Sequence, residues 1–465
     1  MKKSKIVCIG AGSFSFGLST LVTLLKSEPL QGSEIVLVDQ NQEALDLISS
    51  LAEWLNQEWG TGKVISSFSH HHRALSGANF VISAIEVPPR EQLWQQDYEI
   101  TLKYGLRQPY AENGGPGGFA HAARNVLPVL DIVYDMEAKC PDAWFLNFTN
   151  PMQRICALIH HYSEIKVVGL CHQLGAAYAM AAKALAQDFG FDPGDDFVST
   201  HSAKENHAPM SRMGTLGFEH FKIKAAGVNH FTWMLDLRHR ITGEDLYPLF
   251  RKRWQVMDPH FEPLTRAVFD AFGLFPVPGD EHLCEYLPWV SDPITKPWEK
   301  YDLSLYDWQE RARNREETWT QVKDIVHRKD NPDQFASALS EGAVEIIEGI
   351  LGNQDLVWEA VNIPNRSYIP NLPENAIIEL PGLVNAHGIT GIPMGPLPDG
   401  IAEILCREIS ASQLCIDAVV HGDRQLAMQC LLLDPFIRDI DMAKVILDDY
   451  LTTYRVYLPQ FWGDK

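Results

Sequence analysis

The sequence predicts an α/β protein in which an N-terminal Rossmann-like parallel sheet packs against an α+β C-terminal lobe. Three observations support this prediction. A strand–turn–helix–strand unit opens the chain, strands and helices alternate as far as about residue 190, and charged helical stretches dominate the second half. A chain of 465 residues is also too long for one simple hydrophobic core. We therefore expect two closely joined units, residues 1–190 and residues 191–465.

Short apolar runs mark the strands of the first unit, and apolar residues at helical spacing mark its helices. The expected strands are residues 5–9, 34–39, 79–85, 144–148 and 166–170, and the clearest helices are residues 18–25 and 119–140. Because strands that alternate with helices pair in parallel, these elements predict a doubly wound sheet.

The second unit has fewer strands and longer, more charged helices. Residues 222–233 and 376–380 are predicted strands, residues 303–330 and 341–351 are predicted helices, and the chain is mainly helical from residue 398 onward. No internal repeat or low-complexity linker separates the two units, so we expect them to pack directly on one another.

The charge and the cysteine content disfavour several classes of protein. The formal net charge is −21, which argues against nucleic acid and anionic membranes as partners. No apolar run approaches the length of a signal-peptide core or a membrane span, so we expect a cytoplasmic protein. The eight cysteines are scattered, with no Cys-x-x-Cys pair, which is typical of buried, reduced thiols.

A dinucleotide-binding motif lies at the start of the chain. Gly10-x-Gly12 follows the first strand and opens a helix, where glycines let the backbone approach a pyrophosphate. Asp39 ends the next strand, where a carboxylate can bind ribose hydroxyls and favours NAD over NADP. The usual third glycine is replaced by Ser15, and the next glycine is Gly17. We favour NAD binding, and the alternative is a nucleotide-free domain with a tight turn.

Three polar motifs lie at strand ends, the edge where open α/β sheets bind their ligands. They are Asn147-Phe148-Thr149-Asn150-Pro151, Gly169-Leu170-Cys171-His172-Gln173 and Gly227-Val228-Asn229-His230. Cys171 and His230 can share one divalent ion and leave positions open for substrate oxygens. Taken singly, the first motif is more typical of a turn before a helix, Cys171 of a packed thiol, and His230 of a hydrogen-bonded core histidine.

Two further segments carry candidate site residues. The glycine-dense segment 112–118 can fold closely around a ligand or form a flexible surface loop. The loop 276–281, which can reach over the cleft, carries Asp280 and Glu281 and is followed by His282. Its two acids are candidate bases or simply solvated side chains.

Taken together, these residues resemble those of glycoside hydrolase family 4, an NAD-dependent exception to the usual two-carboxylate mechanism. The similarity covers most of the chain, and the markers occur in the family's order. They are Gly10-Ala11-Gly12-Ser13, Gly115-Pro116-Gly117-Gly118, Asn147 to Pro151, Gly169-Leu170-Cys171-His172, Gly227-Val228-Asn229-His230, Glu285-Tyr286-x-Pro288-Trp289 and Val361-Asn362-Ile363-Pro364-Asn365. The resemblance implies a fold like that of lactate and malate dehydrogenases, NAD and a divalent metal (expected to be Mn²⁺) as cofactors, and a homodimer or homotetramer.

The resemblance also implies the reaction. NAD⁺ oxidises C3 of the sugar, a base removes the C2 proton while the metal stabilises the enediolate, and the aglycone leaves from C1 with the help of an acid. Water then adds and the steps reverse, so NADH is reoxidised. The expected substrate is a small, non-phosphorylated α-glycoside, because His172 stands where members that act on phosphorylated sugars have an acidic residue.

The roles of individual residues are carried over by position. The metal ligands would be Cys171 and His230, the acid His172, and the base Asp280, with Glu281 and Tyr286 as alternatives. The cofactor residues would be Gly10, Gly12, Ser13, Phe14, Asp39 and Glu86. The substrate residues would be Asn150, Asn229, Arg90, His121 and Arg124.

The sugar itself is left open by the sequence. Arg90, His121 and Arg124 can bind an acidic C6 group, as in galacturonides, glucuronides or sulfoquinovosides, or can form ordinary structural pairs. Two other functions fit parts of the chain. An NAD-dependent sugar or hydroxy-acid dehydrogenase would share the fold but accumulate NADH, and a non-catalytic NAD sensor would bind the cofactor without cleaving a sugar.

Overall fold

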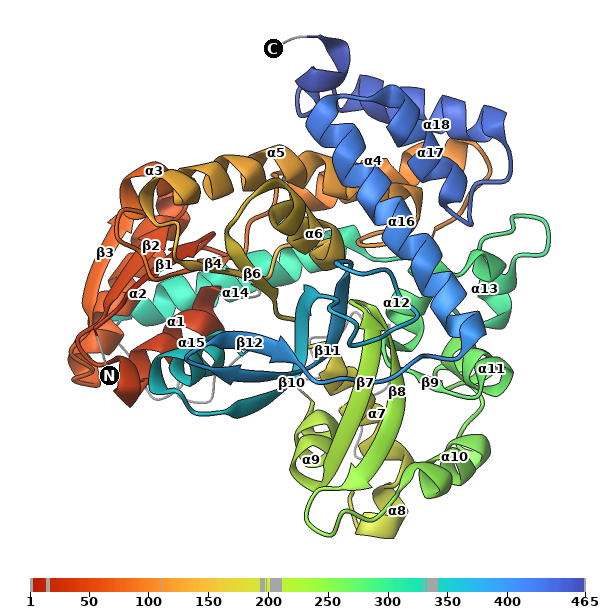
Figure 1. The fold of residues 1–465 in the computed structure, drawn as a ribbon, viewed down its shortest axis with the longest axis horizontal. Helices are drawn as coiled ribbons and strands as arrows, with labels where there is room; N and C mark the ends of the chain where they lie inside the picture. The colour runs from red at the N-terminus through yellow and green to blue at the C-terminus, as the bar shows by residue number, and fades with distance from the viewer. Residues whose placement is uncertain are drawn as a thin grey trace.

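A twelve-stranded sheet organises the protein in the computed structural model. The structure describes residues 3–13, 17–108, 110–192, 197, 199–200, 211–328, 331–332 and 342–463. The sheet runs from β3 at one edge to the β7–β8 hairpin and β9 at the other, and helices cover it from both sides (Figure 1).

Six parallel strands form the first half of this sheet, in the order β3-β2-β1-β4-β5-β6. They are β1 (Lys5–Ile9), β2 (Glu34–Val38), β3 (Val64–Phe68), β4 (Phe80–Ser83), β5 (Trp144–Asn147) and β6 (Lys166–Gly169). This is the strand order of a dinucleotide-binding fold, so the predicted fold class is confirmed. β3 was not among the predicted strands.

The parallel strands inside the sheet are buried on both faces because helices cover both, whereas the edge strand β3 is partly exposed. Along β1, Ile6 and Cys8 join one apolar cluster and Val7 and Ile9 join the other, as the two-residue period of a strand requires. The covering helices are α1 (Gly17–Lys26), α2 (Gln42–Glu58), α3 (His71–Ala74), α4 (Arg90–Lys103), α5 (Gly115–Lys139) and α6 (Met152–Tyr162). The next two helices, α7 (Leu174–Ala184) and α8 (Ala186–Phe189), belong to a separate apolar cluster with the antiparallel half of the sheet.

Antiparallel strands extend the sheet beyond β6. They are β7 (Phe221–Val228), β8 (Phe231–His239), β9 (Phe275–Pro276), β10 (Leu356–Pro364), β11 (Ile377–Asn385) and β12 (Gly388–Gly391). β10 lies against β6, with Asn362 opposite Gly169, and β11 lies between β10 and β7. The sheet therefore continues across residue 190, and the division into residues 1–190 and 191–465 stays a prediction.

The predicted strand 222–233 is wrong in one respect, because it is a hairpin. β7 and β8 pair antiparallel around a turn formed by Asn229 and His230. His230 has a φ of 62°, a left-handed conformation that is uncommon for residues other than glycine. The turn brings the backbone sharply round at the residue that was predicted to bind a metal.

The remaining helices come from the second half of the chain. They are α9 (Arg212–His220), α10 (Tyr247–Val256), α11 (Pro263–Phe272), α12 (Gly279–Tyr286), α13 (Pro297–Lys300), α14 (Trp308–Arg328), α15 (Ala343–Gly352), α16 (Asp399–His421), α17 (Arg424–Leu433) and α18 (Ile440–Thr453). α14 and α15 correspond to the predicted helices 303–330 and 341–351. The long α16 packs on α5 and α6, while α17 and α18 lie beyond it at the C-terminal end (Figure 1).

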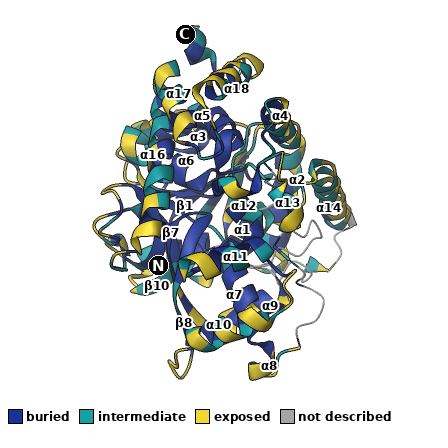
Figure 2. Cartoon of the chain, turned by 90° about the vertical axis from the view of Figure 1, so that its right-hand side faces the viewer, coloured by how far each residue is buried: buried dark blue, intermediate teal, exposed yellow. Residues whose placement is uncertain are grey.

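The sheet interior and the helix faces that cover it are buried, and the exposed residues lie on the outer helix surfaces (Figure 2). In the part of the chain that the structure describes, every helix is too short or too polar to cross a membrane.

Candidate functional site

The predicted dinucleotide turn joins β1 to α1 and depends on its glycines. Gly10 has a φ of +78°, and a Cβ there would lie 2.4 Å from the carbonyl oxygen of Ala84. The Gly12 amide donates to Asp39 Oδ2 at 2.8 Å, and a Cβ at Gly12 would lie 2.9 Å from that oxygen. A side chain on Gly10 would collide with the backbone after β4, and one on Gly12 would collide with the Asp39 carboxylate, so both positions of this dinucleotide-type turn require glycine.

The role of the missing third glycine falls to Gly17. α1 begins at this residue, and a Cβ on it would lie 2.2 Å from the carbonyl oxygen of Ala11. Glycine here allows the close approach of helix and strand that the third motif glycine normally provides. Ser13 closes the turn by donating its amide to Gly10 O at 2.8 Å, and Phe14 lies outside the described residues.

Cys171 and His230 come together as the sequence predicted. Cys171 follows β6 and His230 lies in the hairpin turn, and Cys171 Sγ is 3.2 Å from His230 Nε2. Burial, reinforced by the nearby His282, holds the pKa of His230 well below its usual value, so the imidazole is neutral. A neutral imidazole beside a thiol is the donor set that a divalent transition metal prefers. The buried Nδ1 of His230 has no hydrogen-bond partner among the described residues.

Glu112 and His282 also reach this site. Donor atoms of Glu112, His230 and His282 all lie within 4.8 Å of one another. The two imidazole rings are stacked, however, with centroids 4.0 Å apart and planes tilted by only 6°. Because imidazole binds a metal in the plane of its ring, stacked rings cannot share one ion without turning. Cys171 and Glu112 are therefore the better partners for His230, and His282 packs against it.

Glu285 holds these side chains in place. Its carboxylate accepts hydrogen bonds from Asn113 N at 2.5 Å and Gly114 N at 3.2 Å, and contacts His282 Nδ1 at 2.6 Å. Burial alone would lower the pKa of His282, but this carboxylate outweighs it and raises the pKa to about 9. The glycine-dense segment is thus tied to α12.

Glu112 and His282 were not among the predicted site residues, although both segments had been singled out. Burial alone would raise the pKa of Glu112, but its cationic neighbours, Arg90 and His282 among them, outweigh burial and lower the pKa to about 2. Two features of the sequence could have drawn attention to these residues, the run of glycines after Glu112 and the acidic loop before His282. Neither signal says which side chain turns inward.

Two predicted sugar-binding amides each retain an unused acceptor. Asn150 Nδ2 donates to Glu112 Oε1 at 2.9 Å, and Asn229 Nδ2 donates to Glu379 Oε2 at 2.7 Å. The Oδ1 atoms of both residues are buried and have no hydrogen-bond partner among the described residues. Such acceptors suit the hydroxyl groups of a sugar.

The predicted cations near the site are already paired. His121 Nε2 lies 2.9 Å from Glu86 Oε1, and Arg90 Nη2 lies 3.5 Å from Glu112 Oε1. Glu86, predicted to bind the cofactor, thus faces His121 in this structure. Burial alone would raise the pKa of Glu86, but His121 and Arg90 outweigh it and lower the pKa.

Arg124 does not fit its predicted role in substrate binding. Its guanidinium makes a bidentate pair with Asp97, at 2.8 and 2.7 Å, and both side chains are fully buried. Tyr454 covers the pair, with its ring 4.5 Å from the guanidinium carbon. The charge of Arg124 and its Nη1 and Nη2 donors are therefore used within the fold.

Asp280 does not fit its predicted role as the base. Its carboxylate is fully buried and accepts hydrogen bonds from Leu264 N at 2.9 Å and Thr265 N at 2.6 Å, which caps the start of α11. Burial and the adjacent Glu262 raise its pKa well above the usual value. From the first turn of α12 the carboxylate therefore faces the start of α11, 15 or 16 residues earlier in the chain, and not a ligand.

The alternatives to Asp280 differ in exposure. Tyr286 is buried, stacks on Phe231 with centroids 4.8 Å apart, and has a pKa raised well above 10 by burial. Glu281 is partly exposed, and burial of its carboxylate raises its pKa. A carboxylate with a raised pKa is better suited to accept a proton than a buried phenol.

Comparison with known proteins identifies the family. The model of "Family 4 glycosyl hydrolase" matches residues 5–187, and that of its C-terminal domain matches residues 225–437. The α-glucosidase of Erwinia rhapontici is 30% identical over 93% of both chains, and the α-galactosidase of Bacillus subtilis is 29% identical over 98% of this chain and 99% of that one. The chain belongs to glycoside hydrolase family 4 and is a glycosidase.

Solved structures agree with this assignment. A protein of Bacillus subtilis described as a glucosidase, lplD, superposes with a TM-score of 0.82 at 25% identity, covering 97% of this chain and all of that one. A 6-phospho-α-glucosidase from gut microorganisms, solved with NAD and Mn²⁺, gives a TM-score of 0.79 at 20% identity over 99% of this chain and all of that one. At that identity the second likeness concerns the fold alone.

Proposed function

We propose that this glycosidase cleaves a non-phosphorylated α-glycoside and needs NAD and a divalent metal such as Mn²⁺. The observation that carries the proposal is the contact of Cys171 Sγ with His230 Nε2, 3.2 Å apart, at the sheet edge that also bears the dinucleotide turn. The family's relatives include α-glucosidases, α-galactosidases and α-galacturonidases. A solved 6-phospho-α-glucosidase of the same fold contains both NAD and Mn²⁺.

The residues present fit both groups. Gly10 and Gly12 leave the turn open where a Cβ would fill it, and Asp39 offers a carboxylate at the end of β2. Cys171 and His230 offer a thiol and a neutral imidazole whose second nitrogen is unpartnered. When bound, NAD would take and return a hydride, and the metal would draw electron density from the oxygens of the sugar.

The chain's own residues would supply binding and proton transfer. Asn150 presents its unpartnered Oδ1 to a sugar hydroxyl, and His172, partly exposed beside Cys171, donates a proton to the departing glycosidic oxygen. Glu281 takes the C2 proton, in place of Asp280, because it is the partly exposed carboxylate of the α12 turn. Asn229 supports the same sugar from the hairpin turn.

The first experiment is an assay of nitrophenyl α-glycosides with and without NAD⁺ and Mn²⁺ under reducing conditions. We expect cleavage of one sugar that requires catalytic NAD⁺ and is lost in Cys171→Ser. Cys406→Ser is the matched control, because Cys406 is also partly exposed but lies on α16. Hydrolysis that persists without NAD⁺, or stoichiometric NADH from free sugars, would contradict the proposal.

The role of Glu281 has its own test. If a base removes the C2 proton, sugar released in D₂O carries deuterium at C2. Glu281→Gln should lose this exchange while still binding NAD, whereas Asp280→Asn should change stability more than exchange. Full exchange in Glu281→Gln would return the role to Tyr286.

The cytoplasmic location and the homodimer or homotetramer remain part of this proposal. Light scattering after size-exclusion chromatography would settle the number of subunits.

A further inference from the structure

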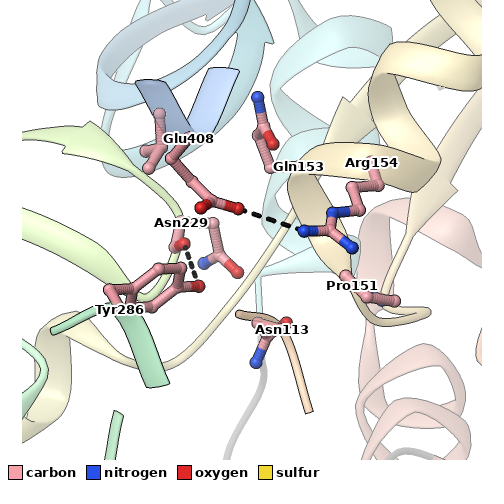
Figure 3. A pocket seen from close by; sticks show the side chains of 8 residues that line it. Asn113, Pro151, Gln153, Arg154, Asn229, Tyr286 and Glu408 are labelled. Atoms are coloured by element: carbon pink, nitrogen blue, oxygen red, sulfur yellow. Dashed lines mark hydrogen bonds and ion pairs between the residues drawn. The ribbon is translucent and has the colours of Figure 1, made fainter. Parts of the chain in front are cut away.

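A small polar pocket adjoins the proposed metal site. It lies between α6, α12, α16 and the hairpin turn, and its polar lining includes Asn113, Arg154, Asn229, Tyr286 and Glu408 (Figure 3). Asn113 and Asn229 are the chain neighbours of Glu112 and His230, so the pocket lies close to the proposed metal site. It has room for about one water-sized group.

Two amide oxygens of the pocket lining have no donor. Asn113 Oδ1 and Asn229 Oδ1 are buried and lack hydrogen-bond partners among the described residues. The two side chains are 4% and 3% exposed, so bulk water does not satisfy them. A buried carbonyl oxygen without a donor is costly, and a ligand hydroxyl would relieve that cost.

The donor in the pocket is Arg154, and its charge is balanced. Arg154 is 2% exposed and points from α6 toward Glu408 on α16 (Figure 3). Its Nη2 lies 3.3 Å from Glu408 Oε1, and its Nε donates to Ser412 Oγ at 3.3 Å. Both contacts are longer than a strong charge-assisted hydrogen bond, so the guanidinium can still donate to a neutral oxygen. The pair offers little net charge to an anion.

The predicted cations add no free charge. Arg90 is paired with Glu86 and Glu112, and His121 is paired with Glu86. An anionic sugar bound here would have to compete with those carboxylates or approach them, which costs energy in a poorly hydrated site.

We propose that this pocket binds an uncharged, hydroxyl-bearing end of the sugar, so that the enzyme takes a neutral α-hexoside and rejects uronides, sulfonates and phosphates. Arg154 and Glu408 are then a specificity-determining pair, and Asn113 and Asn229 accept from the bound hydroxyl. This inference rests on the proposed glycosidase function and replaces the anionic sugar that the sequence suggested. A sulfonate or phosphate would also exceed the size of the pocket.

The test compares matched pairs of nitrophenyl glycosides, α-galactoside with α-galacturonide and α-glucoside with α-glucuronide, with NAD⁺ and Mn²⁺ present. We expect NAD-dependent cleavage of a neutral member and at least about tenfold lower kcat/KM for its uronide. NAD-dependent cleavage that favours a uronide would overturn this inference and leave the proposed function standing. If the enzyme cleaves none of these glycosides and no sulfoquinovoside either, the proposed function is overturned instead.

A charge variant provides the second arm. Glu408→Gln leaves the Arg154 charge uncompensated, so the ratio of uronide to hexoside kcat/KM should rise about tenfold. Glu359→Gln is the matched control, because it breaks an ion pair with Arg240, at 3.1 Å, that does not line the pocket. If Glu408→Gln fails to fold, binding of free galactose and galacturonate to the wild-type holoenzyme gives the same comparison by calorimetry. The inference would be overturned if the ratio of uronide to hexoside kcat/KM were equal in the wild type, Glu408→Gln and Glu359→Gln. It would also be overturned if the wild type bound galacturonate more tightly than galactose.

Discussion

Replacing Arg124 by methionine should destabilise the protein without weakening substrate binding. Arg124 and Asp97 are both fully buried and share two hydrogen bonds, of 2.8 and 2.7 Å, so the variant leaves a buried carboxylate without its cation. Breaking such a pair typically costs about 3–5 kcal/mol. Tyr454 still donates to Asp97 Oδ1 at 2.6 Å, so we expect the lower half of that range. That loss corresponds to roughly a hundredfold increase or more in the unfolding constant.

Urea denaturation of Arg124→Met, followed by tryptophan fluorescence, measures this loss, and KM for the cleaved glycoside measures substrate binding. The double variant Asp97→Leu/Arg124→Met is the control, because it removes both charges and should recover much of the stability. The reasoning would be refuted if Arg124→Met unfolded at the wild-type urea concentration while KM rose tenfold. That result would restore Arg124 to the substrate site.

Three other predictions follow from single groups. Asp39→Asn should weaken NAD binding about tenfold and lower the ratio of the NADP to the NAD dissociation constant, since an amide does not repel a 2′-phosphate. Calorimetric titration with both dinucleotides measures this ratio, and an unchanged ratio would contradict the prediction. Burial raises the pKa of Asp434 to about 7, so the folded protein binds its proton more tightly than the unfolded chain, and its contribution to stability is lost as pH rises from about 4 to about 7. In Asp434→Asn this pH-dependent loss of unfolding free energy, on the order of 4 kcal/mol at most, should be absent. The measurement compares the free energy of unfolding against pH for the wild type and the variant, and parallel curves would show that Asp434 does not titrate in this range. Cys171 and Cys406 are the two partly exposed cysteines, so maleimide should label both in the native protein. Mn²⁺ with NAD should protect Cys171 alone from labelling, which peptide mass spectrometry would measure.

The parallel half of the sheet could be predicted because its signals are local. Each strand from β1 to β6 is a short run, and most are apolar enough to stand out from the helices around them. β3 was missed because its sequence, Val64-Ile65-Ser66-Ser67-Phe68, is half polar, as suits an edge strand with partly exposed side chains. The hairpin was missed because neither residue of its turn is glycine, so the sequence predicted one strand that continued through Asn229 and His230.

The candidate site was predictable where a motif ended a strand, and less so where a side chain lay in a loop. Cys171 and His230 each directly follow a predicted strand, which is where open α/β sheets bind ligands, although β10 and β11 lie between those two strands in the sheet. Asp280 was predicted to lie in a loop but stands in the first turn of α12, and its carboxylate caps a helix that begins 17 residues earlier, at Pro263. Whether a loop acid faces a ligand or a helix end depends on packing that no local pattern records.

The position of His230 beside Cys171 depends on a buried carboxylate that no motif singled out. Glu379 on β11 accepts from Asn229 Nδ2 at 2.7 Å and from Asn362 Nδ2 at 2.9 Å. Asn362 on β10 also donates to the carbonyl of Gly169, at 3.3 Å, two residues before Cys171. One carboxylate thus links the hairpin turn, through β10, to the end of β6, and burial raises its pKa. The pair proposed to bind the metal is therefore brought together by the antiparallel extension of the sheet, although 59 residues separate Cys171 from His230 in the chain.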